Sequence, residues 1–342
     1  MTNLNIITDN KTINYNLLEQ VDAHLLFPDV YGKGEVSVKR RVHRHPDCLA
    51  SNKGYVPDEV VLRRTLAWWH APQRQALALY GETGTGKSDM ALYIADKLNE
   101  PAYIVKVNPA MMPEHLEGGK ELTVQNGVAV TEDRLGPAVK AYQNGGVLIL
   151  DEVDKSNEAV QAAMHGLVEG KPWPVEMFSV TVTKHPMCRV MGTANTTGEG
   201  GSEKYITSQK MDDALRSRFG WLELRYPEPA VELEIMKRNF PKLPYGLMVN
   251  MVKLANAVRT VVYADDSNVK AVFSTRTIVN WAHYLMVFGL HAKGRDSLNF
   301  VFKGSVDTDS IEAVEDIIQQ VFDRELDLPV KDIIAKYAVK KP

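Results

Sequence analysis

One octapeptide constrains the fold of this chain more than any other feature. Residues 81–88 read Gly-Glu-Thr-Gly-Thr-Gly-Lys-Ser, between an apolar run at 75–80 and a helical pattern at 87–99. The three glycines let the backbone curl so that its N–H groups converge. A strand that passes through such a loop into a helix begins a βαβ unit, and the apolar run at 102–107 supplies the second strand. The spacing therefore predicts an α/β fold with a parallel sheet.

The same octapeptide has the composition of a phosphate-binding loop. Converging N–H groups and the positive end of the following helix favour an anion. Lys87 offers a point charge to the β- and γ-phosphates, and the Ser88 hydroxyl can ligate Mg²⁺. A merely flexible glycine-rich loop is the alternative, and the strand–loop–helix context disfavours it. We therefore expect ATP and Mg²⁺ as cofactors. The expected nucleotide ligands are Gly81, Glu82, Thr83, Gly84, Thr85, Gly86, Lys87 and Ser88.

A second apolar run, at 147–150, ends in the acidic pair Asp151 and Glu152. A strand buried on both faces places its carboxyl end at the ligand crevice of a parallel sheet. Asp151 can hold Mg²⁺ together with Ser88, and Glu152 can deprotonate the water that attacks the γ-phosphate. The alternative is a pair of acids that only caps the next helix. Because a phosphate loop precedes it, the pair predicts ATP hydrolysis, with the acids at the tip of the strand adjoining the loop.

Composition narrows the class of protein. The 342 residues carry a formal net charge of −3, so no global field attracts nucleic acid. The two cysteines, Cys48 and Cys188, form no pair motif, which is typical of a reducing compartment. Neither a signal peptide nor an apolar stretch of membrane-spanning length is evident. We expect a cytoplasmic protein that has no contact with a membrane.

A basic run at 39–45 leaves two interpretations open. It is either a solvated strand edge or a contact for nucleic acid or an acidic partner. His43, His45 and Cys48 lie in and just after this run. Three ligands at that spacing, without a matching distal pair, do not form a zinc signature.

The remaining pattern divides the chain into three parts. Residues 1–56 read as an N-terminal extension, 57–226 as the α/β nucleotide-binding core and 227–342 as a helical lid domain. Within the core, two alternating runs at 121–131 flank Asn126-Gly127, a dipeptide that favours a tight hairpin turn. In the lid the pattern predicts helices near 230–239, 246–262, 274–288, 309–322 and 330–337.

These features together resemble the AAA+ ATPases of the MoxR-type and chelatase-type group, most of all the ATPase subunits of aerobic cobaltochelatases. The resemblance covers roughly residues 57–292. It is carried by Leu-Gly-Pro-Ala at 135–138, by the strand and acids at 145–152, and by the helix that ends in Leu-Val-Glu at 167–169. In that group a β-hairpin is inserted into the second helix of the core and points toward the pore of a ring. The predicted hairpin falls at the same place.

The resemblance also implies further catalytic residues. Asn195, within Gly-Thr-Ala-Asn-Thr, matches the sensor-1 position beside the γ-phosphate; a plain turn asparagine is the alternative. Arg218 matches the arginine finger that a neighbouring subunit contributes, and Arg216 is the second candidate; a surface salt bridge is the alternative. Arg276 matches sensor 2 at the start of a lid helix. Thr275 stands where the family more often has proline, so the start of that helix is less fixed by the sequence.

The resemblance implies a ring of identical subunits, expected to be a hexamer. It implies a remodelling or chelatase-type activity on a protein partner, for which a von Willebrand A-type protein is a candidate. This sequence contains no Asp-x-Ser-x-Ser motif, so such a partner domain would be a separate chain. One alternative is a motor stimulated by nucleic acid through the run at 39–45. Another is a nucleotide-gated binding module that barely turns over.

Overall fold

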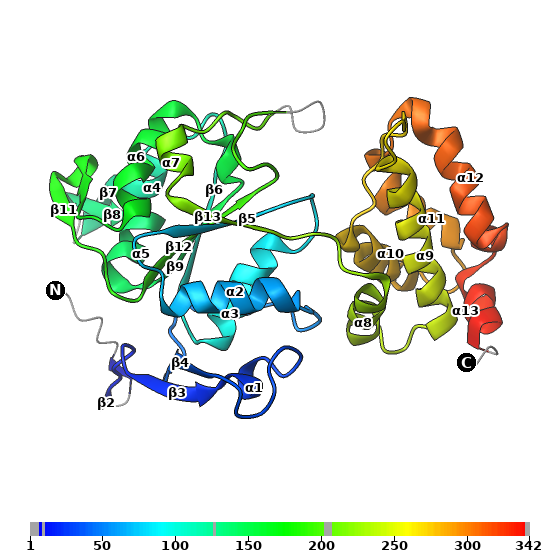
Figure 1. The fold of residues 1–342 in the computed structure, drawn as a ribbon, viewed down its shortest axis with the longest axis horizontal. Coiled ribbons are helices and arrows are strands. Elements are labelled where there is room, and N and C mark those ends of the chain that lie inside the picture. Colours follow the sequence, from blue (N-terminus) through cyan, green and yellow to red (C-terminus); the bar gives the residue numbers. More distant parts are fainter. Residues whose placement is uncertain (1–6, 9–10, 126–127, 202–206, 339–342) are drawn as a thin grey trace. The chain divides into compact units, whose positions relative to one another are not determined.

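The computed structural model describes residues 7–8, 11–125, 128–201 and 207–338. The chain forms two compact units. The first comprises Met1–Asn52, Pro57–Gly81 and Gly86–Leu224, and the second comprises Lys53–Val56, Glu82–Thr85 and Arg225–Pro342. Figure 1 shows the sheet-bearing first unit in blue to green and the helical second unit in yellow to red. The α/β class and the helical second part are therefore as predicted.

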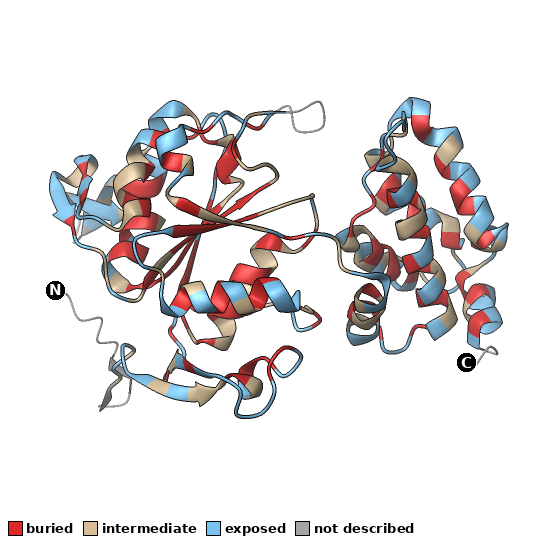
Figure 2. Ribbon diagram, in the orientation of Figure 1, coloured by how far each residue is buried: buried red, intermediate tan, exposed pale blue. Residues whose placement is uncertain are grey.

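The first unit is built on a five-stranded sheet in which every neighbouring pair of strands is parallel. Its order is β13 (Phe219–Glu223), β5 (Ala76–Tyr80), β12 (Cys188–Ala194), β9 (Gly146–Asp151) and β6 (Ala102–Lys106). Apolar side chains cover these strands, which are largely buried (Figure 2). The expected adjacency of the glycine-rich loop strand and the acidic strand is wrong: β12 lies between β5 and β9. The sequence shows strands in chain order, whereas hydrogen-bonding neighbours depend on crossovers between them.

Four longer helices pack on this sheet: α2 (Glu59–His70), α3 (Lys87–Lys97), α5 (Pro137–Asn144) and α6 (Glu158–Glu169). Each start has a local cause. The Asp58 carboxylate accepts from Val61 N at 2.8 Å, and Asn157 caps α6 in the same way. Pro137, whose fixed φ suits a first helical turn, begins α5. These helices confirm the predicted α/β alternation.

The predicted hairpin is present. Strands β7 (Gly118–Gln125) and β8 (Val128–Leu135) pair antiparallel directly after the short helix α4 (Glu114–Glu117). Asn126 and Gly127, the predicted turn, lie outside the described residues. Leu122, Val124 and Val128 are 74%, 73% and 64% exposed, so the hairpin presents apolar side chains to solvent. A second antiparallel pair, β10 (Trp173–Val175) and β11 (Val180–Val182), follows α6.

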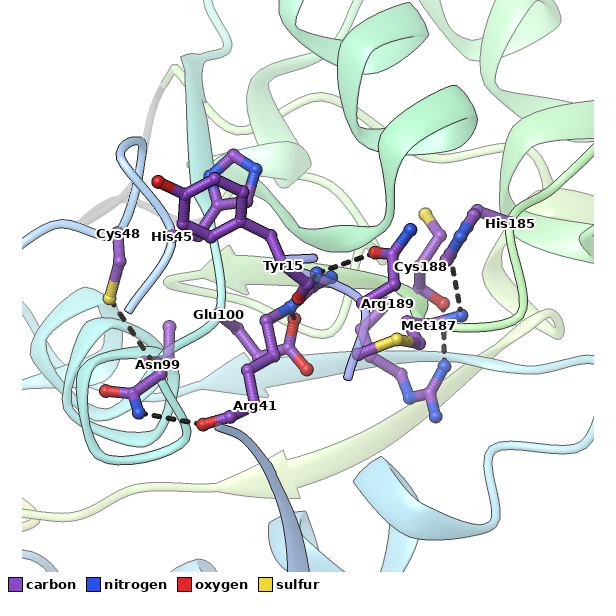
Figure 3. Close-up of polar contacts among 12 residues, drawn as sticks. Tyr15, Arg41, His45, Cys48, Asn99, Glu100, His185, Met187, Cys188 and Arg189 are labelled. Atoms are coloured by element: carbon purple, nitrogen blue, oxygen red, sulfur yellow. Dashed lines mark hydrogen bonds and ion pairs between the residues drawn. The ribbon is translucent and has the colours of Figure 1, made fainter. Parts of the chain in front are cut away.

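The N-terminal segment is part of the first unit. Beyond the short pair β1 (Ile7–Thr8) and β2 (Lys11–Thr12), strand β3 (Leu18–Asp22) pairs with β4 (Ser37–Arg41), and α1 (Ala23–Leu26) follows β3. Arg41, which is fully buried, donates to Glu100 at 2.6 Å, to Tyr15 O at 2.7 Å and to Asn16 Oδ1 at 2.9 Å (Figure 3). This ion pair ties the segment to the loop between α3 and β6.

The basic run at 39–45 lies along β4 and the turn after it. Its arginines are paired inside the chain: Arg40 with Glu19 at 2.8 Å, Arg41 with Glu100, and Arg44 with Asp96. The first of the two interpretations, a strand edge, is therefore the one that the structure favours. No group of three potential His, Cys, Asp or Glu metal ligands occurs in the described ranges.

The second unit consists of helices. They are α8 (Pro229–Asn239), α9 (Tyr245–Val262), α10 (Thr275–Val287), α11 (Gly294–Phe302), α12 (Ile311–Phe322) and α13 (Val330–Ala338). Five were predicted to within two residues; α11 was not, because its sequence begins with glycine and carries no capping signal. Trp281 is fully buried, and Phe273 and Phe322 pack against it. Among the described residues, none of the helices combines the length and the apolar character needed to span a bilayer.

Candidate active site

The glycine-rich loop connects β5 to α3, and its conformation depends on glycine. Gly81 has φ +142°, and a Cβ built on it lies 2.2 Å from the carbonyl oxygen of Leu224. A side chain therefore does not fit there. Gly86, the N-cap of α3, has φ +93° and brings no side chain to the helix start. Thr85 Oγ1 donates to Glu82 O at 2.9 Å and closes the turn between them. Such a turn leaves room for a ligand close to the backbone.

Lys87 lies at the junction of the loop and the sensor-1 segment. Its side chain is only 9% exposed. The Nζ atom donates to Gly81 O at 2.7 Å and to Asn195 Oδ1 at 3.2 Å. The predicted phosphate-binding lysine and the predicted sensor-1 asparagine are thus in direct contact, although they lie far apart in sequence. Since β12 is the neighbour of β5, Asn195 follows the strand closest to the loop.

The predicted metal ligands are also brought together. The Ser88 hydroxyl donates to Asp151 Oδ1 at 2.6 Å. The hydroxyl of Thr193, at the end of β12, donates to the same oxygen at 2.6 Å and accepts from Glu152 N at 3.0 Å. Thr193 therefore connects both acids and was missed by the sequence reasoning. The sequence feature that could have identified Thr193 is its position two residues before Asn195, on a strand whose end adjoins the two acids.

Glu152 has a backbone conformation that non-glycine residues rarely adopt, with φ 61° and ψ 45°. Such local strain concentrates at functional sites. Its carboxylate is flanked by lysines, with Lys155 Nζ at 3.2 Å and Lys106 Nζ at 3.9 Å. The side chain is 29% exposed, so water reaches it.

Asp154 is a further polar residue that the sequence reasoning did not identify. It lies in the 3₁₀ turn Val153–Lys155, directly after Glu152, and it is fully buried. Its Oδ2 atom accepts from Asn195 N at 3.1 Å and from Thr196 N at 3.2 Å. The backbone of the sensor-1 segment is thereby held against the turn that carries Glu152. The sequence contains no signal that distinguishes Asp154 from an ordinary acidic residue at the start of a helix.

The two finger candidates lie at the end of a short helix, α7 (Asp213–Arg216), and differ in their partners. The Arg218 guanidinium donates to the Glu169 carboxylate and to Ala214 O. Arg216 has looser ion pairs, with Glu199 at 3.6 Å and Asp213 at 4.0 Å.

The carboxylate that holds Arg218 is itself shared. Hydrogen bonds from Lys171 and Arg218 lower the pKa of Glu169, so that this carboxylate stays ionised. Arg218, Lys171 and Arg74 also line a surface pocket, which makes that pocket rich in positive charge. These partners differ from those of Lys87, Ser88 and Asp151. The structure does not bring the two arginines into the cluster around Ser88.

Arg276 belongs to the second unit, together with loop residues Glu82–Thr85. A Cβ built on Gly84 lies 2.5 Å from the Cβ of Ser274 and 3.7 Å from that of Arg276. In the same unit the Tyr226 hydroxyl donates to Thr83 O at 2.8 Å. The middle of the loop is therefore packed closely against the start of α10.

The start of α10 is fixed even though proline is missing from it. Ser274 and Thr277 form a capping box in which each side chain accepts from the backbone N–H of the other residue. The Thr275 hydroxyl donates to Glu232 Oε1 at 2.6 Å, and Glu232 forms a buried ion pair with Arg259 at 2.8 Å. In place of the ring of proline, the capping box and the Thr275 hydrogen bond hold this helix start.

The cluster in the first unit fits a magnesium nucleotide. A hydroxyl and a carboxylate, those of Ser88 and Asp151, are the hard oxygen ligands that Mg²⁺ prefers. An ammonium group, Lys87 Nζ, lies next to them at the start of an 11-residue helix. The close approach at Gly81 keeps side chains out of the backbone curve that phosphates would occupy.

Comparisons with known proteins agree with this arrangement. Residues 76–219 match the family described as AAA domain (dynein-related subfamily), and residues 232–321 match the family described as CbbQ/NirQ/NorQ C-terminal.

Three curated proteins are similar to the chain over much of its length. The aerobic cobaltochelatase subunit CobS of Sinorhizobium sp is 27% identical over 286 residues, covering 81% of this chain and 81% of that protein. Protein NorQ of Paracoccus denitrificans is 27% identical and covers 66% of this chain and 78% of its own length. Mouse von Willebrand factor A domain-containing protein 8 is 27% identical over 66% of this chain and 12% of that protein.

Proposed function

We propose, from the premise that this chain is an AAA+ ATPase of the MoxR, CobS and NorQ type, that it hydrolyses Mg·ATP at the Lys87–Asp151 cluster to remodel a partner protein. The observation that carries this proposal is the contact of Ser88 with Asp151 at 2.6 Å beside the contact of Lys87 with Asn195 at 3.2 Å. These four residues come from three separate stretches of sequence, and each has the chemistry that its place requires.

The chemical step assigns one role to each residue. Lys87 and the backbone of the loop bind the β- and γ-phosphates, and Glu152 accepts a proton from water. The water oxygen forms a bond to the γ-phosphorus while the bond to the bridging oxygen breaks, giving ADP and phosphate. Asn195 orients the water and donates to a γ-phosphate oxygen. Ser88 and Asp151 would hold Mg²⁺, which would neutralise phosphate charge when bound.

Two arginines, one from the same subunit and one from a neighbouring subunit, would complete the site. We propose that residues 57–226 act as the nucleotide-binding core and 227–342 as the lid, in a hexameric ring of identical subunits. Arg276 would contact the γ-phosphate within its own subunit. Arg218 would reach the nucleotide of the neighbouring subunit, exchanging Glu169 for phosphate, and Arg216 is the second candidate. Support comes from the exposure of both finger side chains, 28% for Arg218 and 34% for Arg216.

The partner would be a separate protein with a von Willebrand A-type domain. The name of the mouse relative joins such a domain to a segment similar to this chain. A contact surface is available on the hairpin, where Leu122, Val124 and Val128 are mostly exposed. Leu122 and Val124 lie two residues apart on one face of β7, and soluble proteins rarely leave neighbouring large apolar side chains in water without a use for them. We propose that the hairpin contacts the partner.

The alternative of a nucleic-acid motor has little support. Each arginine of the run at 39–45 is engaged by a carboxylate of the same chain. Phosphate contacts would have to compete with these pairs.

A three-variant comparison tests the ATPase site. Lys87→Ala should lose ATP binding. Glu152→Gln should bind ATP like the wild type but turn over about a hundredfold more slowly or worse. Glu158→Gln, an exposed acid at the start of α6, is the matched control and should behave like the wild type. ADP release and the affinity for a fluorescent ATP analogue are measured. Equal turnover of Glu152→Gln and wild type would refute the assignment.

A mixing experiment tests the shared site. Arg218→Ala subunits keep Glu152, and Glu152→Gln subunits keep Arg218. Where the two alternate in a ring, an intact Glu152 meets an intact arginine from its neighbour. ATPase activity should therefore reappear on mixing two variants that are inactive alone. If mixing restores nothing for either Arg218→Ala or Arg216→Ala, neither arginine acts across a subunit boundary.

A further inference from the structure

The segment after Glu152 contains the buried carboxylate of Asp154. Only one of its two oxygen atoms accepts hydrogen bonds from the described residues. Asp154 Oδ2 accepts the two backbone N–H groups of Asn195 and Thr196, the Thr196 hydroxyl at 3.1 Å and the Ser208 hydroxyl at 2.8 Å. Its Oδ1 atom is buried and has no hydrogen-bond partner among the described residues. Burying a carboxylate costs free energy unless it is well hydrogen-bonded. We therefore infer that the contacts made by Oδ2 have a role that compensates for the unpaired Oδ1 atom.

Asp154 Oδ2 holds the sensor-1 turn, which contains Asn195 and Thr196. The backbone N–H of Asn195 is fixed by Asp154, while its side-chain Oδ1 accepts from Lys87. The backbone of Asn195 is thus attached to the turn that carries Glu152, and its amide faces the phosphate-binding lysine. Removing the acceptor would leave two backbone N–H groups unpaired and release Asn195 from Glu152.

A second buried side chain on the following helix holds the finger segment. Gln161 is 5% exposed and donates through Nε2 to Ser156 O at 2.9 Å and to Lys210 O at 3.4 Å. Its Oε1 atom accepts from Asp212 N at 2.7 Å. Asp212 is the N-cap of α7, the helix that leads to Arg216 and Arg218. Gln161 therefore fixes the position of the helix start from which both arginines project.

We propose that Asp154 and Gln161 are positioning residues that act on two different active sites. Asp154 aligns Asn195 for hydrolysis in its own subunit, and Gln161 aligns the arginine that serves the neighbouring subunit. Both lie within residues 153–161, directly after Glu152, so one short stretch of the chain sets the geometry of two active sites. The backbone supports this linkage, because Gln209 N donates to Asp154 O at 2.7 Å. The inference rests on the proposed ring and on the finger assignment.

Subunit mixing distinguishes effects on the two active sites. Asp154→Asn keeps the shape and an acceptor oxygen but removes the charge that attracts four donors. Its kcat should fall about a hundredfold, as expected for a misplaced catalytic group, with ATP affinity within about threefold of the wild type. Mixing with Glu152→Gln should not restore activity, because the damaged sensor and the intact Glu152 belong to the same subunit.

Gln161→Met keeps the length of the side chain but loses its polar atoms. It should lower kcat about tenfold or more with ATP affinity retained, and mixing with Glu152→Gln should restore activity as it does for Arg218→Ala. Thr196→Val removes one hydroxyl donor to Asp154 and is a milder variant if Asp154→Asn does not fold. It should show a smaller defect that mixing does not restore.

The outcomes separate two failures. If neither Arg218→Ala nor Arg216→Ala is restored by Glu152→Gln, the proposed shared site is wrong. If Arg218→Ala is restored but Gln161→Met is not, or if Asp154→Asn is restored or is as active as wild type, the positioning roles are wrong. Thermal denaturation of each variant accompanies the assays. If both residues had a purely structural role, both variants would have a lower melting temperature. Mixing with Glu152→Gln would then not distinguish a defect in the variant's own site from a defect in the neighbouring site.

Discussion

The hydroxyl of Ser88 and the carboxylate of Asp151 lie 2.6 Å apart, one at the start of α3 and the other at the end of β9. One strand of the sheet, β12, lies between the loop strand β5 and β9. The contact therefore depends on the helix start reaching across β12. It gathers two hard oxygen ligands at one place.

Ser88→Ala should weaken the response to magnesium more than it weakens nucleotide binding. Asp151 would keep its hydrogen bond from Thr193, so the local fold should persist. We expect the Mg²⁺ concentration for half-maximal ATPase to rise about tenfold or more, since one oxygen ligand of the ion is lost. A magnesium titration of ATPase activity at saturating ATP measures this. Ser217→Ala, at an exposed hydroxyl, is the control; an unchanged titration curve for Ser88→Ala would contradict the metal role.

Thr193→Val should impair catalysis, and Thr193→Ser should not. The hydroxyl donates to Asp151 and accepts from Glu152 N, whereas valine has the same shape without either bond. A buried N–H would then be unpaired beside a strained Glu152. We expect kcat to fall about tenfold to a hundredfold for valine, with ATP affinity kept. Steady-state kinetics of the two variants, side by side, measure this, and equal kcat values would show that the hydroxyl has no positioning role.

Glu232→Ala should strongly destabilise the second unit. Glu232 is fully buried and holds Arg259, which is 7% exposed, so the substitution leaves a buried cation without its partner. The expected loss in free energy of unfolding is about 3–5 kcal/mol. Thr275→Val removes only the hydroxyl donor to Glu232 and should cost about 1 kcal/mol. Urea denaturation followed by circular dichroism measures both. Similar losses for the two variants would mean that the ion pair is not the dominant contribution.

Stability should decline as the pH falls below about 6.5, the ordinary histidine value. Burial first, and the nearby Arg41 second, lower the pKa of His45 and of His185. The Nδ1 atom of His45 accepts from Asp47 N. The Nδ1 atom of His185 accepts from Met187 N (Figure 3), so the folded state requires both rings to be neutral. Because the folded-state pKa lies below the unfolded one, the unfolded chain takes up protons first, and stability is lost until the folded-state pKa is passed.

The melting temperature should therefore be lower at pH 5.5 than at pH 7.5. His185→Asn keeps a side-chain acceptor but does not titrate, and it should reduce this difference. His43→Asn, at an exposed histidine, is the matched control. An identical pH dependence for His185→Asn and wild type would show that the ring at 185 does not contribute.

Patterns in the sequence predicted those elements whose formation depends on a few neighbouring residues. The glycine-rich loop and the apolar run ending in Asp151 each act within a few residues, and each was read correctly as an element. The pairing of β5 with β12 was not predictable, because a crossover sets it. Asp154 and Gln161 carried no signal, since an acid or an amide in an amphipathic segment is normally exposed and only tertiary packing buries it. The N-terminal strands escaped prediction because their polar and apolar residues do not alternate.

The attachment of Glu100 to Arg41 has a practical consequence for anyone who trims this protein. The AAA match begins at residue 76, yet the counter-ion of Glu100 comes from far upstream of it. Burial already raises the pKa of Glu100, and Arg41 opposes that rise. A fragment cut at the boundary of sequence similarity would inherit an orphaned acid in its interior, at a cost of about 3–5 kcal/mol. The smallest self-sufficient piece of the ATPase is therefore larger than the segment that the AAA match covers.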